Sequence, residues 1–548
     1  MWFLEFLKAF IGVPAFLVGL VTLIGALILR KKFSQVIIST FKVIIGFLIL
    51  GGGAGVLVGS LDKFQPVFQA VYKLQGSIPN NDAFAGVLTK VPEIATLGSL
   101  IMVVALVLNI VLSLVSRLKY VYLSGHVLFY MSIMLAAVFL TLGFKVSNPG
   151  DFAVMLIGGS TLLASYMVIS PALQQRYMRL ITGSDEIGLG HTGGFGYALS
   201  GLIGEGIGKA FKGKVISTEE IKFPKGLYFF RNTLVSLSIT ILVFYMAAFL
   251  PAGILYETEK ITAENNKAAF EILKDGNWVV TMFVQAFIFT AGIEIMLSGV
   301  RLFIGELIPT FKGISDKLIK NAKAAVDCPV VFPYAPNAVL IGFISSFIAG
   351  IIGMGITIGL AKASLLTIVI LPGIIPHFFL GATSGVFGNV RGGILGAIAG
   401  PFVHGLIITF VPAIFIWGGW IPATNSVLQD LYVNSLDNEK TLFEVLLKSK
   451  VDGEYNFEAF EKLVAQAGIT GKPADLFNEA KALGDKLNAL NWGDTDYIIG
   501  VIPGLLGRIN KYASLAGSLV IFFGLILDGI ISFFVKKSKN NKSQKVAA

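Results

Sequence analysis

The chain has 548 residues, of which 55% are hydrophobic and only 14% are charged. A soluble globular protein carries about 25% charged residues, and a water-soluble fold of this size cannot hide so much apolar surface. This composition argues against a soluble protein and indicates one that has lipid as its solvent. The formal net charge of +10 does not indicate nucleic-acid binding, because Lys and Arg cluster in short segments between apolar runs.

Eleven apolar segments are long enough to cross a bilayer, which takes about 20 mostly apolar residues. In chain order they lie near residues 9–29, 38–60, 95–116, 121–143, 152–171, 232–253, 278–304, 338–361, 364–387, 394–420 and 514–535. A basic cluster follows each odd-numbered segment, from Arg30 after the first to Lys536 after the last. Cytoplasmic loops are rich in Lys and Arg, so this pattern predicts a multi-pass protein with its N-terminus outside and its C-terminus in the cytoplasm.

Helix-breaking residues lie inside two of these segments. The second contains a glycine run over residues 51–55, and the ninth contains Pro372, Gly373 and Pro376. Irregular backbone at membrane depth is tolerated only where protein buries it or where it lines a cavity. Both positions are therefore interpreted as breaks that mark a binding site for a polar solute.

Short motifs recur in the second half of the chain. Residues 124–126 (Ser-Gly-His) are echoed by residues 375–377 (Ile-Pro-His), and Pro-Asn at 79–80 is echoed at 336–337. Both separations are roughly 250 residues, close to five spans. Five is an odd number, so the second copy is expected to be inverted in the membrane.

The predicted fold class is an all-α polytopic membrane protein with about 11 transmembrane helices in two inverted repeats, with broken helices or re-entrant hairpins. One stretch, 421–496, has mixed charge and helical periodicity and is interpreted as a small, mostly helical extracellular insertion that acts as a lid, a spacer or a partner-binding unit. The expected regions are a transmembrane permease region at 1–420 (inverted repeats at approximately 1–171 and 232–420, cytoplasmic linker at 172–231), the insertion at 421–496, and a last transmembrane helix with a basic cytoplasmic tail at 497–548.

Ionisable residues within membrane spans are costly, so each is a functional candidate. His126 is either a functional imidazole or an interfacial histidine bonded to backbone, and His191, in a glycine-rich stretch, is a solute contact or part of a flexible loop. Asp327 can accept two sugar hydroxyls, cap a helix, or pair with Lys323.

Other polar residues have simpler interpretations. Glu294 and Arg301 are expected to form a structural ion pair or to line a pathway, and His404 is expected to be a packed core residue. The single cysteine, Cys328, is interpreted as a small core residue without an activating base. Residues 204–210 (GEGIGKA) lack the first glycine and the Ser or Thr of a P-loop, which argues against an ATP-driven pump.

Five longer motifs, in order along the chain, resemble the ascorbate-type permease (IIC) family of the bacterial phosphotransferase system. They are residues 123–131 (LSGHVLFYM), 183–191 (GSDEIGLGH), 299–307 (GVRLFIGEL), 327–339 (beginning Asp-Cys) and 372–379 (PGIIPHFF). The resemblance runs from about residue 20 to about residue 420 and resumes weakly in the last span. The insertion has no recognisable counterpart.

The resemblance implies a homodimer in the bacterial cell membrane, in which a core part of each protomer carries the sugar in an elevator-type movement. Separate soluble A and B components supply the phosphate, the B component from a phosphocysteine. The chain itself is then expected to position the sugar and to form no phospho-intermediate. Neither a metal, a cofactor nor a nucleic-acid partner is expected, and whether such a positioning subunit counts as an enzyme stays open.

The resemblance also carries over a set of substrate contacts. His126, His191 and Asp327 match as sugar contacts, and Gly53 matches as a position of close approach. Five positions depart from the ascorbate pattern and are expected to tune the choice of substrate, namely Gly51, Ala83, Phe84, Tyr130 and Thr192. A buried hydroxyl left unpaired costs about 1–3 kcal/mol, so such changes can switch the substrate from L-ascorbate to a related sugar acid or sugar alcohol.

Two other classes of function remain open. The first is an ion-coupled secondary transporter of a small polar solute on the same scaffold, for which Glu294 is the candidate coupling residue. The second is a surface receptor or adhesion protein that acts through the outer insertion.

Overall fold

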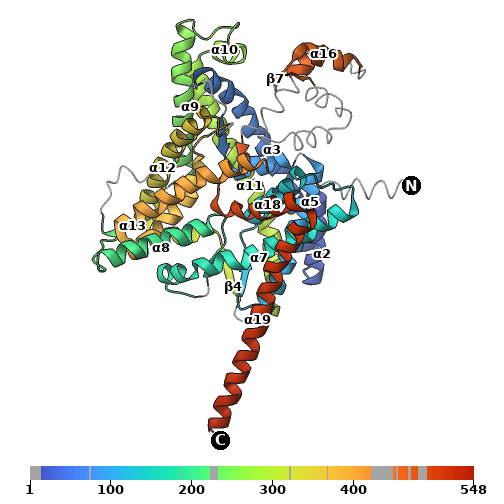
Figure 1. The fold of residues 1–548 in the computed structure, drawn as a ribbon, viewed down its shortest axis with the longest axis vertical. Helices are drawn as coiled ribbons and strands as arrows, with labels where there is room; N and C mark the ends of the chain where they lie inside the picture. The colour runs from blue at the N-terminus through green and yellow to red at the C-terminus, as the bar shows by residue number, and fades with distance from the viewer. Residues whose placement is uncertain are drawn as a thin grey trace.

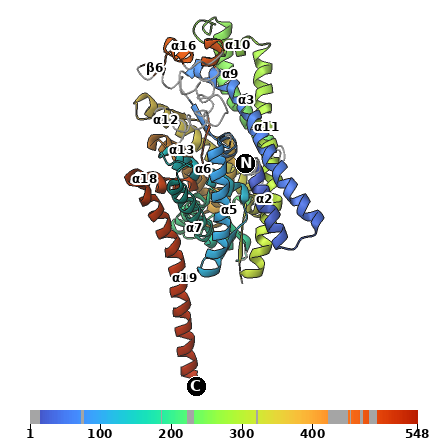
Figure 2. The same ribbon diagram turned by 90° about the vertical axis from the view of Figure 1, so that its right-hand side faces the viewer.

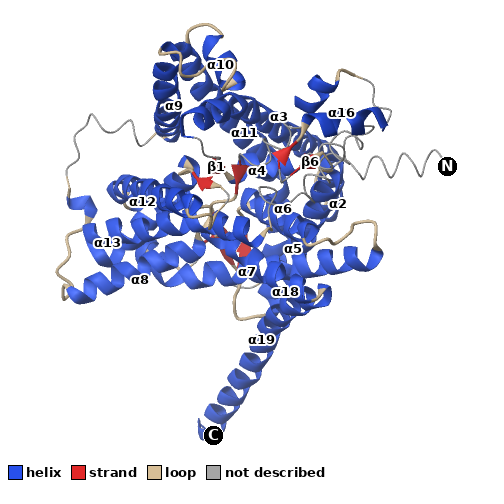
Figure 3. Ribbon diagram, turned by 45° about the horizontal axis from the view of Figure 1, so that its top comes forward, coloured by secondary structure: helices blue, strands red, loops and turns tan. Residues whose placement is uncertain are grey.

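The computed structural model describes residues 14–547, apart from residues 73–75, 90, 186, 222–231, 320–321, 367, 421–448, 452–453, 467–470 and 479–489. Helices make up most of the molecule (Figure 1), and the short strands lie between them (Figure 3). The C-terminal part of the long helix α19 (Lys511–Ala547) projects away from the other helices and carries the C-terminus at its far end (Figure 1, Figure 2).

Every predicted span overlaps a helix of the structure, the ninth only from Ile374 onward. These helices are α2 (Pro14–Ile28), α3 (Phe33–Tyr72), α5 (Pro92–Val115), α6 (Gly125–Thr141), α7 (Pro149–Thr182), α9 (Thr233–Glu257), α11 (Trp278–Leu318), α12 (Pro336–Lys362), α13 (Ile374–Gly418) and α19. Within the described ranges, six helices are long and apolar enough to cross a membrane, and further apolar helices are shorter. The predicted class of all-α polytopic membrane protein is confirmed.

Shorter elements connect these helices. The remaining helices are α4 (Asn81–Leu88), α8 (Gly194–Ala210), α10 (Lys267–Lys274), α16 (Phe457–Gln466) and α18 (Val501–Ile509), with 3-10 turns η1 (Thr218–Glu220), η3 (Cys328–Tyr334) and η5 (Thr495–Gly500). The strands are β1 (Gly76–Pro79), β2 (Tyr120–Tyr122), β3 (Ile187–Leu189), β4 (Lys323–Val326), β5 (Val369–Ile370), β6 (Lys450–Val451), β7 (Glu454–Tyr455) and β8 (Leu490–Asn491).

The glycine run at 51–55 does not interrupt a helix, so the predicted break in the second span is wrong. Helix α3 continues from Phe33 to Tyr72 and packs along α11. A glycine costs about 1 kcal/mol relative to alanine in a helix, which weakens the helix without ending it. A Cβ added at Gly52 or Gly55 would meet nothing within 4 Å, so no close backbone approach explains these two glycines.

The break predicted in the ninth span is present. The chain is extended in β5, and α13 begins only at Ile374. Farther along, Gly393 (φ 56°, ψ −148°) divides α13 into two arms, which correspond to predicted spans nine and ten. The arms turn back on each other so closely that a Cβ at Gly388 would overlap the carbonyl oxygen of Gly396. Both the positive φ at the turn and this approach require glycine.

Two small parallel sheets join the two halves of the chain. Their strand orders are β5-β1-β8 and β2-β4-β3. In chain order, β4 and β5 of the second half correspond to β1 and β2 of the first half. In the sheets, however, β1 pairs with β5 and β2 pairs with β4, so each strand pairs with the counterpart of the other one. A twofold relation between the halves would produce this exchange, and β1 and β4 begin roughly 250 residues apart, as do β2 and β5. The strand pairing therefore supports the predicted repeats.

The helices pack in recognisable groups. Helix α13 packs with α8 and α12, α3 packs with α9 and α11, and α7 packs with α5 and α19. The groups of α12 and α9 lie on different sides of the short strands (Figure 3). The strands and the turns that follow them therefore lie where these groups meet.

Two predicted regions have different limits in the structure. The stretch predicted as a linker, 172–231, contains the end of α7, which extends to Thr182, and all of α8, which packs against both α7 and α13. The insertion predicted to end at residue 496 gives way to the main body earlier, because β8 pairs with β1. The described parts of the insertion include α16 and the β6–β7 hairpin, and residues 421–448 lie outside the described ranges.

Candidate functional site

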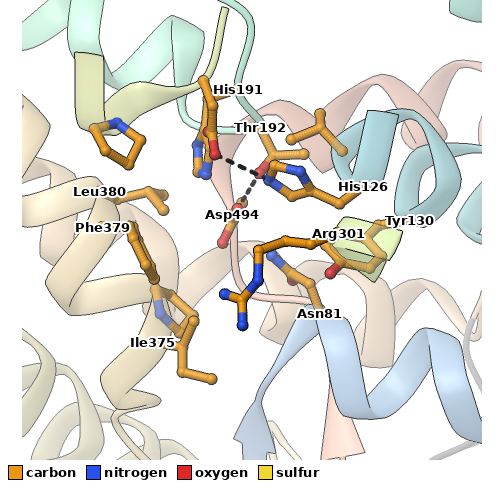
Figure 4. A pocket seen from close by; sticks show the side chains of 14 residues that line it. Asn81, His126, Tyr130, His191, Thr192, Arg301, Ile375, Phe379, Leu380 and Asp494 are labelled. Atoms are coloured by element: carbon orange, nitrogen blue, oxygen red, sulfur yellow. Dashed lines mark hydrogen bonds and ion pairs between the residues drawn. The ribbon is translucent and has the colours of Figure 1, made fainter. Parts of the chain in front are cut away.

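A cavity of about 220 Å³ lies at the ends of the short strands (Figure 4). Its walls come from both halves of the chain and from the segment that follows β8. Five of the predicted substrate contacts line it, namely His126, Tyr130, His191, Thr192 and Asp327. The cavity also has an apolar wall, which contains Pro329, Ile375, Pro376, Phe379 and Leu380.

His126 and Asp327 face each other across the ends of neighbouring strands. His126 lies in the first turn of α6, just after β2, and Asp327 follows β4, the strand that pairs with β2. The Nε2 atom of His126 is 3.4 Å from Oδ2 of Asp327. The other oxygen of Asp327 accepts a hydrogen bond of 2.7 Å from the backbone N–H of Cys328. Of the predicted alternatives, the capping contact is present, whereas Lys323 pairs with Asp185 instead.

His191 is held in one orientation by its own loop. The backbone N–H of Gly193 donates to Nδ1 of His191 at 3.2 Å, and the Tyr197 hydroxyl lies 2.8 Å from the same nitrogen. A ring nitrogen that accepts a hydrogen bond carries no proton, so the neutral imidazole is protonated on Nε2. This geometry makes His191 a hydrogen-bond donor through Nε2.

Three of these side chains could also ligate a metal ion. One donor atom from each of His126, His191 and Asp327 lies within 4.8 Å of the others. Two imidazoles and a carboxylate suit several transition metals. The same atoms are equally suited to sugar hydroxyls, because they offer donors and an acceptor within a small volume.

Two carboxylates that follow β8 were not predicted as site residues. Asp494 lines the cavity and accepts a hydrogen bond from the Thr192 hydroxyl (Figure 4). Asp496 is fully buried and caps the start of α8, accepting from the backbone N–H groups of Gly194 (3.0 Å) and Phe195 (2.8 Å). The sequence feature that could have identified Asp494 and Asp496 is Gly-Asp-Thr-Asp directly before an apolar run, in a chain with few charges.

Arg301 reaches the same cavity from α11 (Figure 4). Its guanidinium is ion-paired with Glu294 and donates to the Ser298 hydroxyl at 3.0 Å. Both parts of the prediction for this pair hold, since the two residues form an ion pair and Arg301 lines the cavity. The site therefore contains a cation that can face an anionic ligand.

The remaining predicted contacts lie elsewhere. Gly53 is buried within α3 and is not among the residues that line the cavity. Phe84 is fully buried and packs edge-on against Trp492, with ring centroids 4.5 Å apart. Ala83 belongs to α4, and its side chain is outside the described part of the structure. Gly53 and Phe84 therefore do not line this cavity.

An ion pair outside the spans fixes the strand that leads to His191. Lys323 of β4 lies 2.8 Å from Asp185, just before β3. The hydrogen bond from the Lys323 ammonium is the main cause of the lowered pKa of the Asp185 carboxyl. Asp185 is half exposed, so solvent screens this pair and its contribution to stability is small.

Comparison with known proteins identifies the family. Residues 9–430 match the family described as the sugar-specific permease component of the PTS system, where PTS denotes the phosphotransferase system. The chain is also 26% identical to the "Ascorbate-specific PTS system EIIC component" of Mycoplasma pneumoniae, over 99% of this chain and 88% of the relative. Since the match covers more than half of the sequence, the chain belongs to the family of sugar-specific permease components of the phosphotransferase system.

Proposed function

We propose that this phosphotransferase permease takes up L-ascorbate or a closely related sugar acid or sugar alcohol. The observation that carries the proposal is the cavity in which His126, His191 and Asp327 converge. The relative named as ascorbate-specific supports the choice of L-ascorbate for the first test.

The cavity has the chemistry that such a ligand needs. Asp327 can accept hydrogen bonds from sugar hydroxyls, and Nε2 of His191 can donate to a hydroxyl or carbonyl oxygen. The apolar wall that includes Phe379 can cover the less polar face of the ring. L-ascorbate is an anion at neutral pH, and Arg301 is the cation that lines this cavity among the described residues.

Phosphorylation is assigned to a separate component. We infer that a soluble B component, itself phosphorylated by an A component, transfers phosphate from a phosphocysteine to the sugar on the cytoplasmic side. Cys328 is fully buried in an apolar cluster, which makes it unsuitable as a phosphate acceptor. The contribution of this chain is then to hold the sugar hydroxyl in position for transfer.

The movement and assembly of the permease are also proposals. We propose a homodimer with the N-terminus outside the cell and the C-terminus in the cytoplasm, in which a sugar-carrying core moves in an elevator-type transition. Support comes from the separate packing groups of α8, α12 and α13 and of α3, α9 and α11, because the cavity has residues from both α13 and α11. Light scattering of the purified chain in detergent tests the dimer.

The decisive experiment is uptake of labelled L-ascorbate into right-side-out membrane vesicles that contain phosphoenolpyruvate and the soluble phosphorelay. Chromatography then identifies the product trapped inside. The expected product is a phosphorylated sugar, formed by the unmodified chain and lost in His191→Ala and Asp327→Ala. The exposed Lys462→Ala variant is the matched control and is expected to behave as the unmodified chain.

Each alternative has its own result. Accumulation of unmodified L-ascorbate that collapses when the ion gradient is dissipated would identify an ion-coupled transporter. Absence of L-ascorbate uptake, with phosphorylating uptake of a pentitol, hexitol or another sugar acid, would keep the permease function and change the substrate.

A further inference from the structure

We propose that Asp494 is a substrate-binding residue, which accepts a hydrogen bond from a sugar hydroxyl in the cavity that Asp327 also lines. This inference rests on the proposed function, because it requires that the cavity binds a sugar. It adds a specificity-determining residue to the predicted substrate contacts. This residue lies near the end of the stretch 421–496, which the sequence analysis interprets as an insertion.

The first argument is the state of the carboxylate itself. Asp494 is 1% exposed and lines the cavity. One of its oxygens, Oδ2, accepts a hydrogen bond from the Thr192 hydroxyl. The other oxygen, Oδ1, is buried and receives no hydrogen bond of normal geometry from the described residues, so the Asn81 amide beside this carboxylate (Figure 4) satisfies it only weakly. A buried acceptor that is only weakly satisfied is costly, and a ligand hydroxyl would relieve that cost.

The second argument is the register of the two sheets. The first residue of β1, Gly76, pairs with the first residue of β5, and the first residue of β4, Lys323, pairs with the first residue of β2. The last residues of β1 and β4 likewise pair with Asn491 of β8 and Leu189 of β3. Strand β8 therefore holds the position in one sheet that β3 holds in the other.

This equivalence relates Asp494 to a predicted substrate contact. Thr192 follows Leu189 by three residues, and Asp494 follows Asn491 by three residues. The two side chains meet in a hydrogen bond, and the backbone N–H of Asp496 donates to the carbonyl oxygen of Thr192 at 2.8 Å. Residues at equivalent positions that touch each other lie close to the axis relating the two halves. Asp494 is thus the second-half counterpart of Thr192 in the cavity wall.

The same register explains why the cavity has unlike walls. His126 and Ile375 each lie six residues after the first residue of β2 and β5, and Tyr130 and Phe379 each lie ten residues after it. All four line the cavity. One half therefore presents polar groups where the other presents apolar ones. Asp494 adds a carboxylate that comes from the second half of the chain and bonds to Thr192 of the first half, so it enlarges the polar part of the cavity wall available to a bound sugar.

A purely structural role for Asp494 predicts a different result. If the carboxylate only holds the Thr192 loop, removing it changes stability and leaves the ranking of ligands unchanged. If it binds a hydroxyl, removing it erases the preference for ligands that carry this hydroxyl. Competition by deoxy sugars separates the two roles because a loop defect weakens all ligands together.

The test uses the full-length chain in vesicles with the phosphorelay inside. Uptake of L-ascorbate, L-gulonate, xylitol and galactitol is measured first, and the sugar that the unmodified chain accumulates is used for every variant. Asp494→Ala and Asp494→Asn are compared with Asp475→Asn, which makes the same change at an exposed carboxylate of the insertion. The readouts are the KM for uptake, the maximal rate and inhibition by single-deoxy analogues of the transported sugar.

The expected result is a KM raised roughly 10- to 100-fold in Asp494→Ala, as for loss of a hydrogen bond to a charged group. One single-deoxy analogue should inhibit uptake by the unmodified chain more weakly than the parent sugar does. The same analogue and the parent sugar should inhibit uptake by Asp494→Ala equally. Asp475→Asn should change neither value. A KM within about twofold and unchanged discrimination against every analogue in both Asp494 variants would overturn the proposal.

Two controls keep the outcomes distinct. If Asp494→Ala fails to fold, as judged by size-exclusion profile, Asp494→Asn decides the question, because it keeps the shape of the side chain and removes the charge. If L-ascorbate is not taken up but another of the four sugars is, the proposed substrate is wrong. The Asp494 test is unaffected, because it uses the sugar that accumulates. Ion-driven accumulation without a phosphorylated product would contradict the proposed coupling to phosphorylation. The role of Asp494 would still be decided by how strongly the single-deoxy analogues inhibit uptake.

Discussion

Nε2 of His404 lies 2.7 Å from the hydroxyl oxygen of Thr495, and this contact connects the second arm of α13 to the carboxylate-bearing segment of the site. Nδ1 of the same ring lies 2.6 Å from the Ser384 hydroxyl in the first arm. The ring is fully buried, so one imidazole joins both arms of the α13 hairpin to the residue between Asp494 and Asp496. His404 is a packed core residue, as predicted, and it is placed to fix the geometry of the site.

Removing this imidazole should destabilise the protein. His404→Ala leaves the hydroxyls of Ser384 and Thr495 without their partner and opens a cavity beside Gly196, where a Cβ would overlap the ring. We expect a loss of about 2–4 kcal/mol, which thermal denaturation in detergent would show as a lower midpoint. His404→Gln should recover part of this loss. A midpoint unchanged in His404→Ala would mean that the arms and the segment do not depend on this contact.

Asp496 is predicted to act on stability more than on ligand choice. Besides capping α8, its carboxylate accepts from the hydroxyls of Tyr166 (2.8 Å) and Ser170 (3.0 Å). Asp496→Ala removes a helix cap and two buried acceptor contacts, so we expect roughly 3 kcal/mol of destabilisation by thermal denaturation. Discrimination among deoxy sugars should persist in any folded Asp496→Asn protein. Loss of that discrimination with normal stability would instead make Asp496 a direct ligand contact.

Arg301 should matter for anionic substrates only. Its guanidinium lines the cavity but is more than half exposed and is shared with Glu294, so its effect on a bound anion is moderate. We expect Arg301→Gln to raise the KM for L-ascorbate by roughly fivefold, about 1 kcal/mol, and to leave uptake of a neutral sugar alcohol unchanged.

The matched control is Arg117→Gln, which removes an exposed arginine that pairs with Asp528. Competition assays at low and high salt measure the difference, because screening should reduce the Arg301 effect. An equal rise in KM for charged and neutral ligands would show that Arg301 supports the fold of the site rather than the charge of the substrate.

The spans and the first half of the site are predictable from sequence for a physical reason. Hydrophobic length and the placement of Lys and Arg report directly on the bilayer, so every predicted span overlaps a helix. His126, His191 and Asp327 stand out because ionisable groups next to apolar runs are costly. The glycines at 51–55 are misleading, since glycine permits a break without requiring one.

The second half of the site depends on long-range pairing that leaves no periodic signal. Asp494 enters the cavity because β8, only Leu490 and Asn491, pairs with β1 more than 400 residues earlier. Two residues are too few to show a strand pattern, and the preceding insertion makes the following carboxylates resemble part of an exposed domain. The swap of strand partners between the two sheets becomes visible only in three dimensions.

Finally, transport should depend on β8 and not on the helical part of the insertion. The described part of the insertion has its own contacts, with the ring of Phe460 packed 5.1 Å from that of Phe477. Replacing residues 450–478 by a short Gly/Ser linker should therefore leave the KM for the transported sugar within about twofold of the unmodified chain. Extending the replacement to residue 491 removes β8 and should abolish uptake, because Asp494 and Asp496 lose the strand that places them. If the shorter replacement abolishes uptake while the protein still integrates into the membrane, the result would favour a function that depends on the segment 421–496.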